Sequence, residues 1–89
     1  MNELETYRNE IDALDNQLLE LLSKRLSVVK KVGVYKHARN LPAYNPARKA
    51  AVMDKFKTLC AALGLGVNFG EELYELIHKY AVKTEEEIK

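Results

Sequence analysis

The sequence predicts an all-α protein with three helices per chain, one long and two shorter, in an intertwined six-helix homodimer. Apolar residues recur at steps of three and four over most of the chain, which is typical of amphipathic helices. The dipeptide Asn45-Pro46 and the glycines Gly64 and Gly66 divide this pattern into three segments. Because no linker or low-complexity tract is present, we expect residues 1–89 to form a single domain.

The first helix is predicted from about residue 4 to residue 38, because no proline occurs inside it and good helix formers dominate. One face carries an apolar seam at helical spacing. The seam consists of Leu4, Tyr7, Ile11, Leu14, Leu18, Leu21, Arg25, Val28, Val32 and Tyr35. Arg25 is the one charged residue among these positions. Since an unpaired buried cation is costly, Arg25 must meet an internal acid, reach water or face a cavity that receives an anionic ligand.

The second helix is predicted to start with Asn45 as N-cap and Pro46 as first residue, and to end near Leu63. Its expected core stripe is Val52, Phe56, Leu59, Cys60 and Leu63. The third helix is predicted to open at Asn68, with Glu71 completing a capping box, and to continue toward Ile88.

The length of the first helix predicts a dimer. A helix of about 34 residues is roughly 50 Å long, whereas a compact globule of this size has a diameter of about 30 Å. Two shorter helices of the same chain cannot cover a seam of that length. We therefore expect a second copy of the chain to cover the remainder.

Composition gives no indication of nucleic-acid or membrane binding. The chain is 47% hydrophobic and 30% charged with a formal net charge of +1. Its first residues lack the features of a signal peptide, which favours a cytoplasmic protein. The single cysteine, Cys60, and two histidines have no metal-ligand spacing, so no metal site is expected.

Basic residues are placed where they could hold a small anion. Arg25 and Lys36 are eleven residues apart, which returns them to within about 20° of each other on one helix face. Arg8 lies about 25 Å from Arg25 along the axis, so it could join the same site only from the other subunit. Arg48 and Lys49 occupy the first turn of the second helix, where the helix dipole disfavours cations and where a bound anion would explain them.

Glu85 follows Tyr74, Ile77 and Ala81 and precedes Ile88 at helical spacing, so its carboxyl group lies along a largely apolar face of the third helix. Glu85 also belongs to the acidic run 85–87 near the expected helix end, where the helix dipole disfavours negative charge. From periodicity alone, Glu85 is therefore interpreted as a frayed terminal residue.

Several of these segments resemble the all-helical class of chorismate mutase. The similarity covers nearly the whole chain and is carried by the strings YRNEIDALDNQLLELLSKRLSVVKKVGVYK, LPAYNPARKAAVM and LYELIHKYAVKTE. The spacings R-x-x-I-D-x-x-D and L-P-x-Y-x-P-x-R occur within them. The resemblance implies an intertwined dimer with two equivalent sites that convert chorismate to prephenate without a cofactor.

The resemblance also implies a role for each matching residue. Arg25, and Arg8 from the partner subunit, would bind the two substrate carboxylates. Lys36 would donate to the breaking ether oxygen, and Glu85 falls on the second donor to that oxygen. The remaining substrate-binding positions would be Asn45, whose backbone would lie near the ring hydroxyl, together with Arg48, Lys49 and Ala81.

Three positions depart from the family pattern. Glu85 can donate a hydrogen bond only when it is protonated. At position 49 the family commonly has a Glu that binds the ring hydroxyl, so Lys49 reverses the charge there, and Ala81 replaces a commonly polar residue. These departures keep two alternatives open: an isochorismate pyruvate lyase, and a non-catalytic helical dimer that binds a dicarboxylate.

Overall fold

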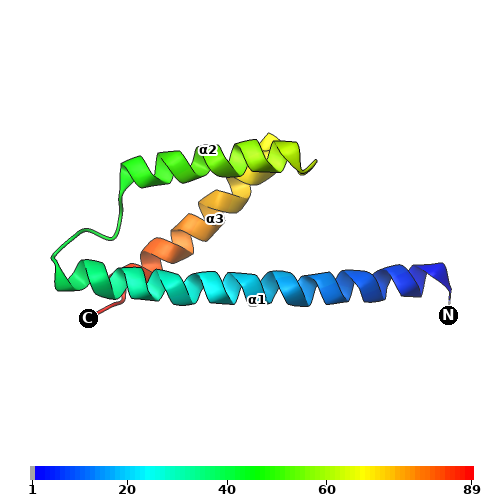
Figure 1. Ribbon diagram of the computed structural model, residues 1–89, viewed down its shortest axis with the longest axis horizontal. Helices are drawn as coiled ribbons and strands as arrows, with labels where there is room; N and C mark the ends of the chain where they lie inside the picture. The colour runs from blue at the N-terminus through cyan, green and yellow to red at the C-terminus, as the bar shows by residue number, and fades with distance from the viewer. Residues whose placement is uncertain (1) are drawn as a thin grey trace.

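The computed structural model describes residues 2–89, which form three α-helices and no strand. The helices are α1 (Glu3–Ala38), α2 (Pro46–Ala62) and α3 (Val67–Glu86). Figure 1 shows α1 as a long rod, with α2 running alongside its C-terminal half and α3 crossing obliquely from the end of α2 back to α1. Within residues 2–89, no helix combines the length and the apolar character needed to cross a membrane.

Side-chain caps begin the first two helices. Asn2 Oδ1 accepts a hydrogen bond from the Glu5 amide at 2.8 Å, and Asn45 Oδ1 accepts one from the Arg48 amide at 3.1 Å. Pro46 follows Asn45 as the first residue of α2, where its missing N–H costs no hydrogen bond. The predicted start of the second helix is therefore confirmed.

The start of α3 differs from the sequence prediction. Its N-cap is Gly66, which has a φ of 93° and no side chain to accept a hydrogen bond, so the predicted capping box of Asn68 and Glu71 is wrong. The physical reason is the turn that ends α2, in which the Leu65 and Gly66 amides both donate to the Cys60 carbonyl. Because the turn ends at Gly66, α3 begins at Val67, before the predicted N-cap Asn68.

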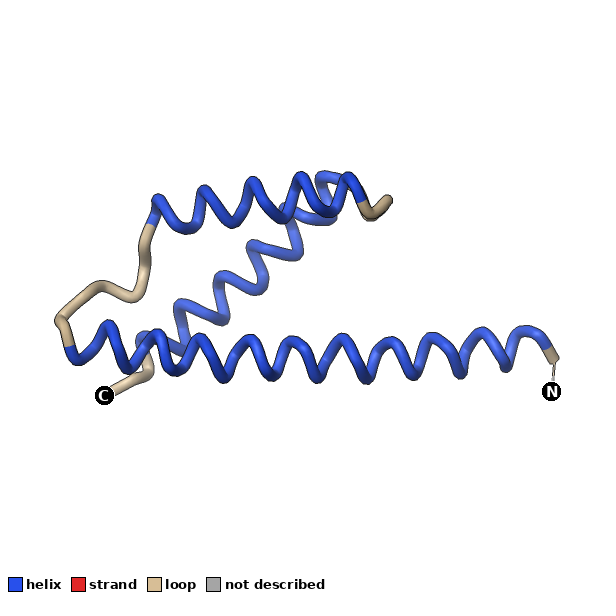
Figure 2. The backbone as a smooth tube through the Cα atoms, viewed as in Figure 1, coloured by secondary structure: helices blue, strands red, loops and turns tan. Residues whose placement is uncertain are grey.

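α3 is the helix that connects the fold, because it packs on both α2 and α1 while α1 and α2 do not contact each other. The tube drawing shows the same arrangement (Figure 2). Val52, Cys60 and Tyr74 are the buried hydrophobic side chains, and the Tyr74 ring lies 4.8 Å from that of Phe56. The predicted core stripe of α2 is only partly correct, because α3 covers its Val52 and Cys60 positions and leaves Leu59 and Leu63 exposed.

A glycine on α1 permits the close approach of α3. A Cβ built at Gly33 would lie 3.1 Å from the Glu85 Cα and 2.9 Å from a side-chain carbon of Ile88. Toward the N-terminus of α1 the two helices diverge, and an apolar cavity of about 230 Å³ separates them near Leu22, Leu26 and Ile77. The contact at Gly33 thus sets where the end of α3 meets α1.

The apolar seam of α1 is exposed along its whole length in the single chain. Leu14 and Leu21, for example, are 61% and 63% exposed. The molecule measures 57 × 26 × 14 Å with a radius of gyration of 16.4 Å, well above the roughly 12 Å of a compact chain of this length. The chain's own helices therefore leave the seam uncovered, as the length argument predicted, and the dimer itself remains a prediction.

Gly70→Ala tests the packing between α2 and α3. A Cβ at residue 70 would lie 2.7 Å from the Phe56 carbonyl oxygen and 3.0 Å from the Cys60 side chain, closer than real contacts allow. We expect this overpacking to exceed the gain in helix propensity and to lower the free energy of unfolding by about 1–3 kcal/mol. Urea unfolding at fixed protein concentration measures it, with the exposed Glu71→Ala as control. An equal or higher stability for Gly70→Ala would contradict the described packing.

Candidate functional site

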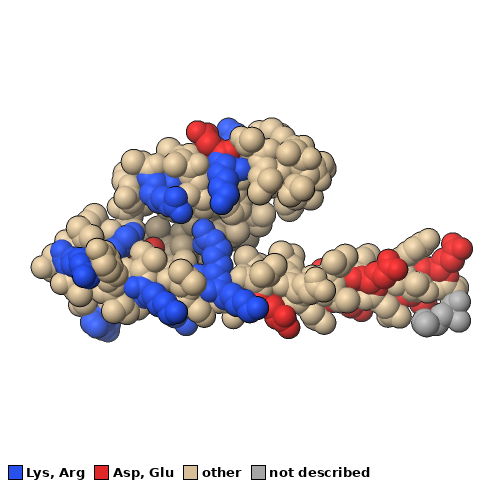
Figure 3. All heavy atoms as spheres, viewed as in Figure 1, with Lys and Arg blue, Asp and Glu red and all other residues tan. Residues whose placement is uncertain are grey.

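A polar pocket of about 160 Å³ lies where the C-terminal half of α1, the start of α2 and the end of α3 converge. Four of its lining residues are cations, namely Arg25, Lys36, Arg48 and Lys49. Glu85 is the one carboxylate among the described residues that line it. Figure 3 shows Lys and Arg atoms on both sides of the hollow between α1 and α2, while acidic atoms gather toward the N-terminal end of α1. The pocket is therefore strongly electropositive.

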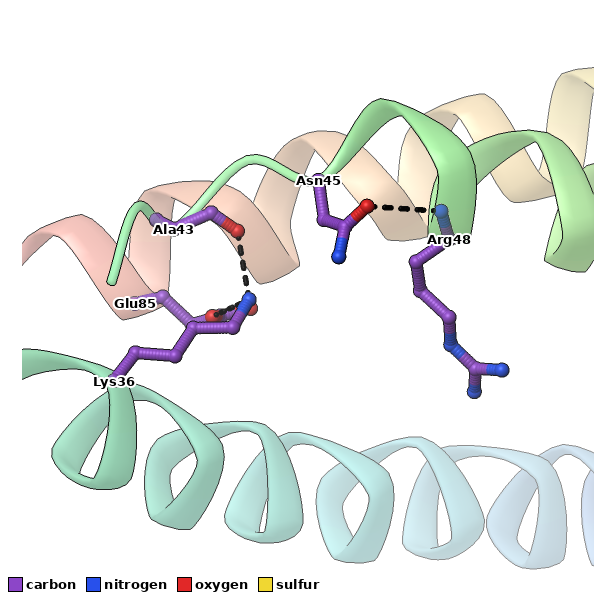
Figure 4. Close-up of polar contacts among 5 residues, drawn as sticks. All are labelled: Lys36, Ala43, Asn45, Arg48 and Glu85. Carbon is purple, nitrogen blue, oxygen red and sulfur yellow. Dashed lines mark hydrogen bonds and ion pairs between the residues drawn. The ribbon is translucent and has the colours of Figure 1, made fainter. Parts of the chain in front are cut away.

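Lys36 is held at the floor of the pocket by two acceptors (Figure 4). Its Nζ donates to the Ala43 carbonyl at 2.9 Å and lies 2.8 Å from Glu85 Oε1. Glu85 Oε1 is buried, and among the described residues it has this ion-pair partner but no hydrogen-bond donor. The two side chains are only 21% and 10% exposed. Lys36 is consequently fixed in direction, and Glu85 retains unused capacity to bond a ligand.

The interpretation of Glu85 as a frayed terminal residue is wrong. Glu85 lies within α3, where its backbone packs against Gly33 and its carboxyl group faces Lys36. Periodicity along α3 could not reveal this role, because the residue is buried by a different helix. The structure thus places Lys36 and Glu85 together, at the two positions that the resemblance assigns to the ether oxygen.

Arg25 lines the pocket about 16 Å from Lys36 along the axis of α1, as the helix spacing predicts. Among the described residues it has no acidic partner, so the internal acid that the sequence left open is absent. Its side chain is exposed and lines both the polar pocket and the neighbouring apolar cavity. Val32, another seam residue, also lines the polar pocket. The pocket therefore borders the exposed seam.

The start of α2 supplies the other side of the pocket. Arg48 extends from α2 toward α1, and Asn45 precedes it at the N-cap (Figure 4). Lys49 is half-buried and lies 3.3 Å from the exposed Glu75 of α3. The first turn of α2 contains no acidic residue, so the positive end of its dipole adds to the charge of the side chains.

His78 is a lining residue that the sequence analysis did not single out. Its ring lies 5.6 Å from the ring of Tyr44 and 5.7 Å from that of Tyr74. Burial, followed by the positive charge of Lys49, lowers the pKa of His78 below its ordinary value of 6.5. The spacing from His78 through Ala81 to Glu85 on one helix face was the signal available in the sequence.

Arg8 is the predicted site residue that the single chain does not bring to the pocket. It is exposed on the N-terminal half of α1 and is not a lining residue. The other predicted residues, including Asn45 and Ala81, all line the pocket. Within residues 2–89, no group of three or more His, Cys, Asp or Glu side chains could hold a metal ion. The arrangement suits a small dianion held by fixed cations.

Comparison with known proteins identifies the family. The sequence model of chorismate mutase type II matches residues 7–86. The chain belongs to the chorismate mutase type II family. The match spans all three helices and every predicted site residue, so the family assignment covers the whole pocket.

Named relatives include proteins of different lengths. The chain is 27% identical over 77 residues to a chorismate mutase of Methanocaldococcus jannaschii, covering 86% of this chain and 78% of that protein. It is 34% identical over 76 residues to a 4-amino-4-deoxychorismate mutase of Streptomyces venezuelae, covering 85% and 74%. It is also 36% identical over 73 residues to the T-protein of Haemophilus influenzae, covering 82% of this chain. The chain spans about a fifth of the length of the two T-proteins it matches.

The Lys36–Glu85 pair can be tested by a double-mutant cycle. Lys36→Met removes the cation beside the buried Glu85 oxygen, and we expect the free energy of unfolding to fall by about 1–3 kcal/mol. Adding Glu85→Gln removes the uncompensated carboxylate and should restore part of that stability. Urea unfolding near neutral pH measures all four proteins. If Glu85→Gln changes the free energy of unfolding by the same amount with Lys as with Met at residue 36, the pair is not coupled.

Proposed function

We propose that this chain converts chorismate to prephenate, as a chorismate mutase. Support comes from membership of the type II family, from the name of the relative of similar length in Methanocaldococcus jannaschii, and above all from the cationic pocket. The reaction is a pericyclic rearrangement in which the ether C–O bond breaks as a new C–C bond forms. It requires neither a nucleophile nor a cofactor. The protein must hold the compact reactive conformer and stabilise charge that grows on the ether oxygen.

In this proposal Lys36 acts where the transition state differs most from the bound substrate. Its ammonium group would donate to the ether oxygen while the Ala43 carbonyl and Glu85 keep it in place. Glu85 would be the second donor when it carries a proton. Arg25 would bind one carboxylate, with Arg48 adding positive charge from α2. Preorganised cations of this kind need no rearrangement when the charge develops.

We further propose that the functional unit is a homodimer in which Arg8 of the partner subunit completes each pocket. The seam of α1 is exposed, and two of its members, Arg25 and Val32, also line the pocket. A second chain packed on the seam would therefore cover the pocket and reduce its water content. Arg8 lies on the part of α1 that projects beyond α2 and α3, so it is positioned to reach across to a neighbour (Figure 1).

Three other activities are alternatives to chorismate mutase. The relative from Streptomyces venezuelae is named for 4-amino-4-deoxychorismate, which has an amino group in place of the ring hydroxyl of chorismate. An isochorismate pyruvate lyase and a non-catalytic dicarboxylate-binding dimer remain the alternatives from the sequence. Supplying chorismate and isochorismate separately distinguishes a chorismate mutase from an isochorismate pyruvate lyase. Binding of a dicarboxylate without turnover of either compound would favour the non-catalytic dimer.

Arg25→Ala tests the proposed activity. We expect the wild type to consume chorismate with prephenate as product, and we expect the variant to lose at least about 100-fold in kcat/KM because a substrate carboxylate loses its cation. Lys24→Ala is the matched control, since it removes the neighbouring positive charge on α1 from a side chain outside the pocket. Circular dichroism checks folding. Absence of prephenate formation by the wild type would refute the proposal.

Mixing two inactive variants tests the dimer and the role of Arg8. We expect Arg8→Ala and Arg25→Ala each to be nearly inactive. When equal amounts are unfolded and refolded together, half of the dimers are mixed and each contains one intact site, so about a quarter of the wild-type activity should return. The Arg8→Ala/Arg25→Ala double variant refolded with Arg25→Ala serves as control. If the mixture stays inactive although both variants dimerise, the two arginines do not meet across subunits.

A further inference from the structure

The part of the pocket next to α2 has an unusual charge distribution for a site that would meet a ring substituent. Arg48 and Lys49 are both cationic, and the first turn of α2 contains no acid. The Asn45 side-chain oxygen accepts one hydrogen bond, from the Arg48 amide at 3.1 Å, and is the one side-chain acceptor at this end of α2 among the lining residues. The side chains of α2 that line the pocket therefore offer mainly hydrogen-bond donors and no negative charge.

Lys49 supplies the most enclosed of these donors on α2. Its side chain is 27% exposed, whereas Arg48 is an exposed residue. The partner of Lys49, Glu75, is 52% exposed and is not among the residues that line the pocket. An ion pair with such an exposed carboxylate is weak, and the ammonium group has three donors, so Lys49 can still bond a ligand.

The charge of Lys49 acts inside the pocket as well as at the surface. His78 lines the pocket between Tyr44 and Tyr74, and Lys49 is the charged group that contributes most to lowering its pKa, after burial. Arg25 lowers that pKa further, while Glu75 and Glu85 oppose the effect. His78 itself offers no negative charge to this part of the pocket.

A hydroxyl group and an amino group interact with such surroundings in opposite ways. A hydroxyl oxygen has lone pairs and accepts a hydrogen bond from an ammonium group. An alkyl amine is protonated near neutral pH, has no lone pair left and repels neighbouring cations. Among the described lining residues, Glu85 alone could balance that charge, and it already faces Lys36 at 2.8 Å. A cationic ring substituent would therefore enter this pocket without an available counter-charge.

We propose that Lys49 makes this site selective for a ring dicarboxylate that carries a hydroxyl group, and selective against the analogue that carries an amino group at the same ring position. Lys49 would donate to the hydroxyl oxygen of chorismate, close to the start of α2. The inference rests on the proposed mutase function. It assigns this chain a different preferred substrate from that in the name of the relative, 4-amino-4-deoxychorismate. Lys49 is then a specificity-determining residue, and the reversal of charge at this position is functional.

The test is the ratio of kcat/KM for chorismate to kcat/KM for 4-amino-4-deoxychorismate at neutral pH. We expect the wild type to favour chorismate by about 100-fold, because placing like charges together is strongly unfavourable. Lys49→Met should lower this ratio by removing the positive charge, and Lys49→Glu should lower it further by supplying an acceptor. Lys55→Glu is the matched control, since it makes the same charge change at an exposed position of α2 outside this pocket.

Each outcome decides the proposal. A ratio that collapses in Lys49→Glu and stays near the wild-type value in Lys55→Glu supports it. A wild-type ratio near one, a ratio unchanged in Lys49→Glu, or an equal change in Lys55→Glu overturns it while leaving the mutase function intact. Turnover of neither compound by the folded wild type refutes the mutase function itself, and with it this inference.

Discussion

The close packing of α3 on Gly33 of α1 is the constraint on which the site depends. Among the helices of the described residues, α1 packs on α3 and not on α2, and the backbone of Glu85 lies against Gly33 at that contact. The same residue then faces Lys36, one helical turn further along α1. A larger residue at 33 would push α3 outward and separate the pair. The packing of α3 on Gly33 and the orientation of the proposed catalytic cation therefore depend on the same contact between α1 and α3.

The pocket gathers positive charge from segments that are far apart in the sequence. Arg25 and Lys36 come from α1, while Arg48 and Lys49 come from the first turn of α2, whose own dipole is also positive there. Repulsion among these groups would be relieved if a dianion bound between them. A site of this kind binds negative charge and stabilises negative charge that develops in a transition state. Catalysis of a pericyclic rearrangement requires this from a protein, because no nucleophile or acid–base group takes part.

Much of this arrangement could be predicted from the sequence, and the failures have physical causes. The misplaced charge of Arg25 and the cap at Asn45 are local patterns, so they identified the pocket-forming helix face and the start of α2. The burial of Glu85 and the position of His78 depend on which helix packs against α3, and periodicity within one helix does not contain that information. The start of α3 was missed because a positive-φ glycine, Gly66, took the place of a side-chain cap. The family resemblance suggested the proposed role of Glu85, which the residue pattern alone did not.

The exposed seam links the fold to the proposed assembly, because Arg25 and Val32 belong both to the seam and to the pocket. The most direct measurement is a crystal structure of the chain with a stable dicarboxylate analogue of the rearranging substrate. The account predicts two chains packed along the α1 seams, with one analogue per pocket held between Arg25, Lys36 and Arg8 of the partner subunit. An analogue bound to an isolated chain, or bound away from the pocket between α1, α2 and α3, would contradict it.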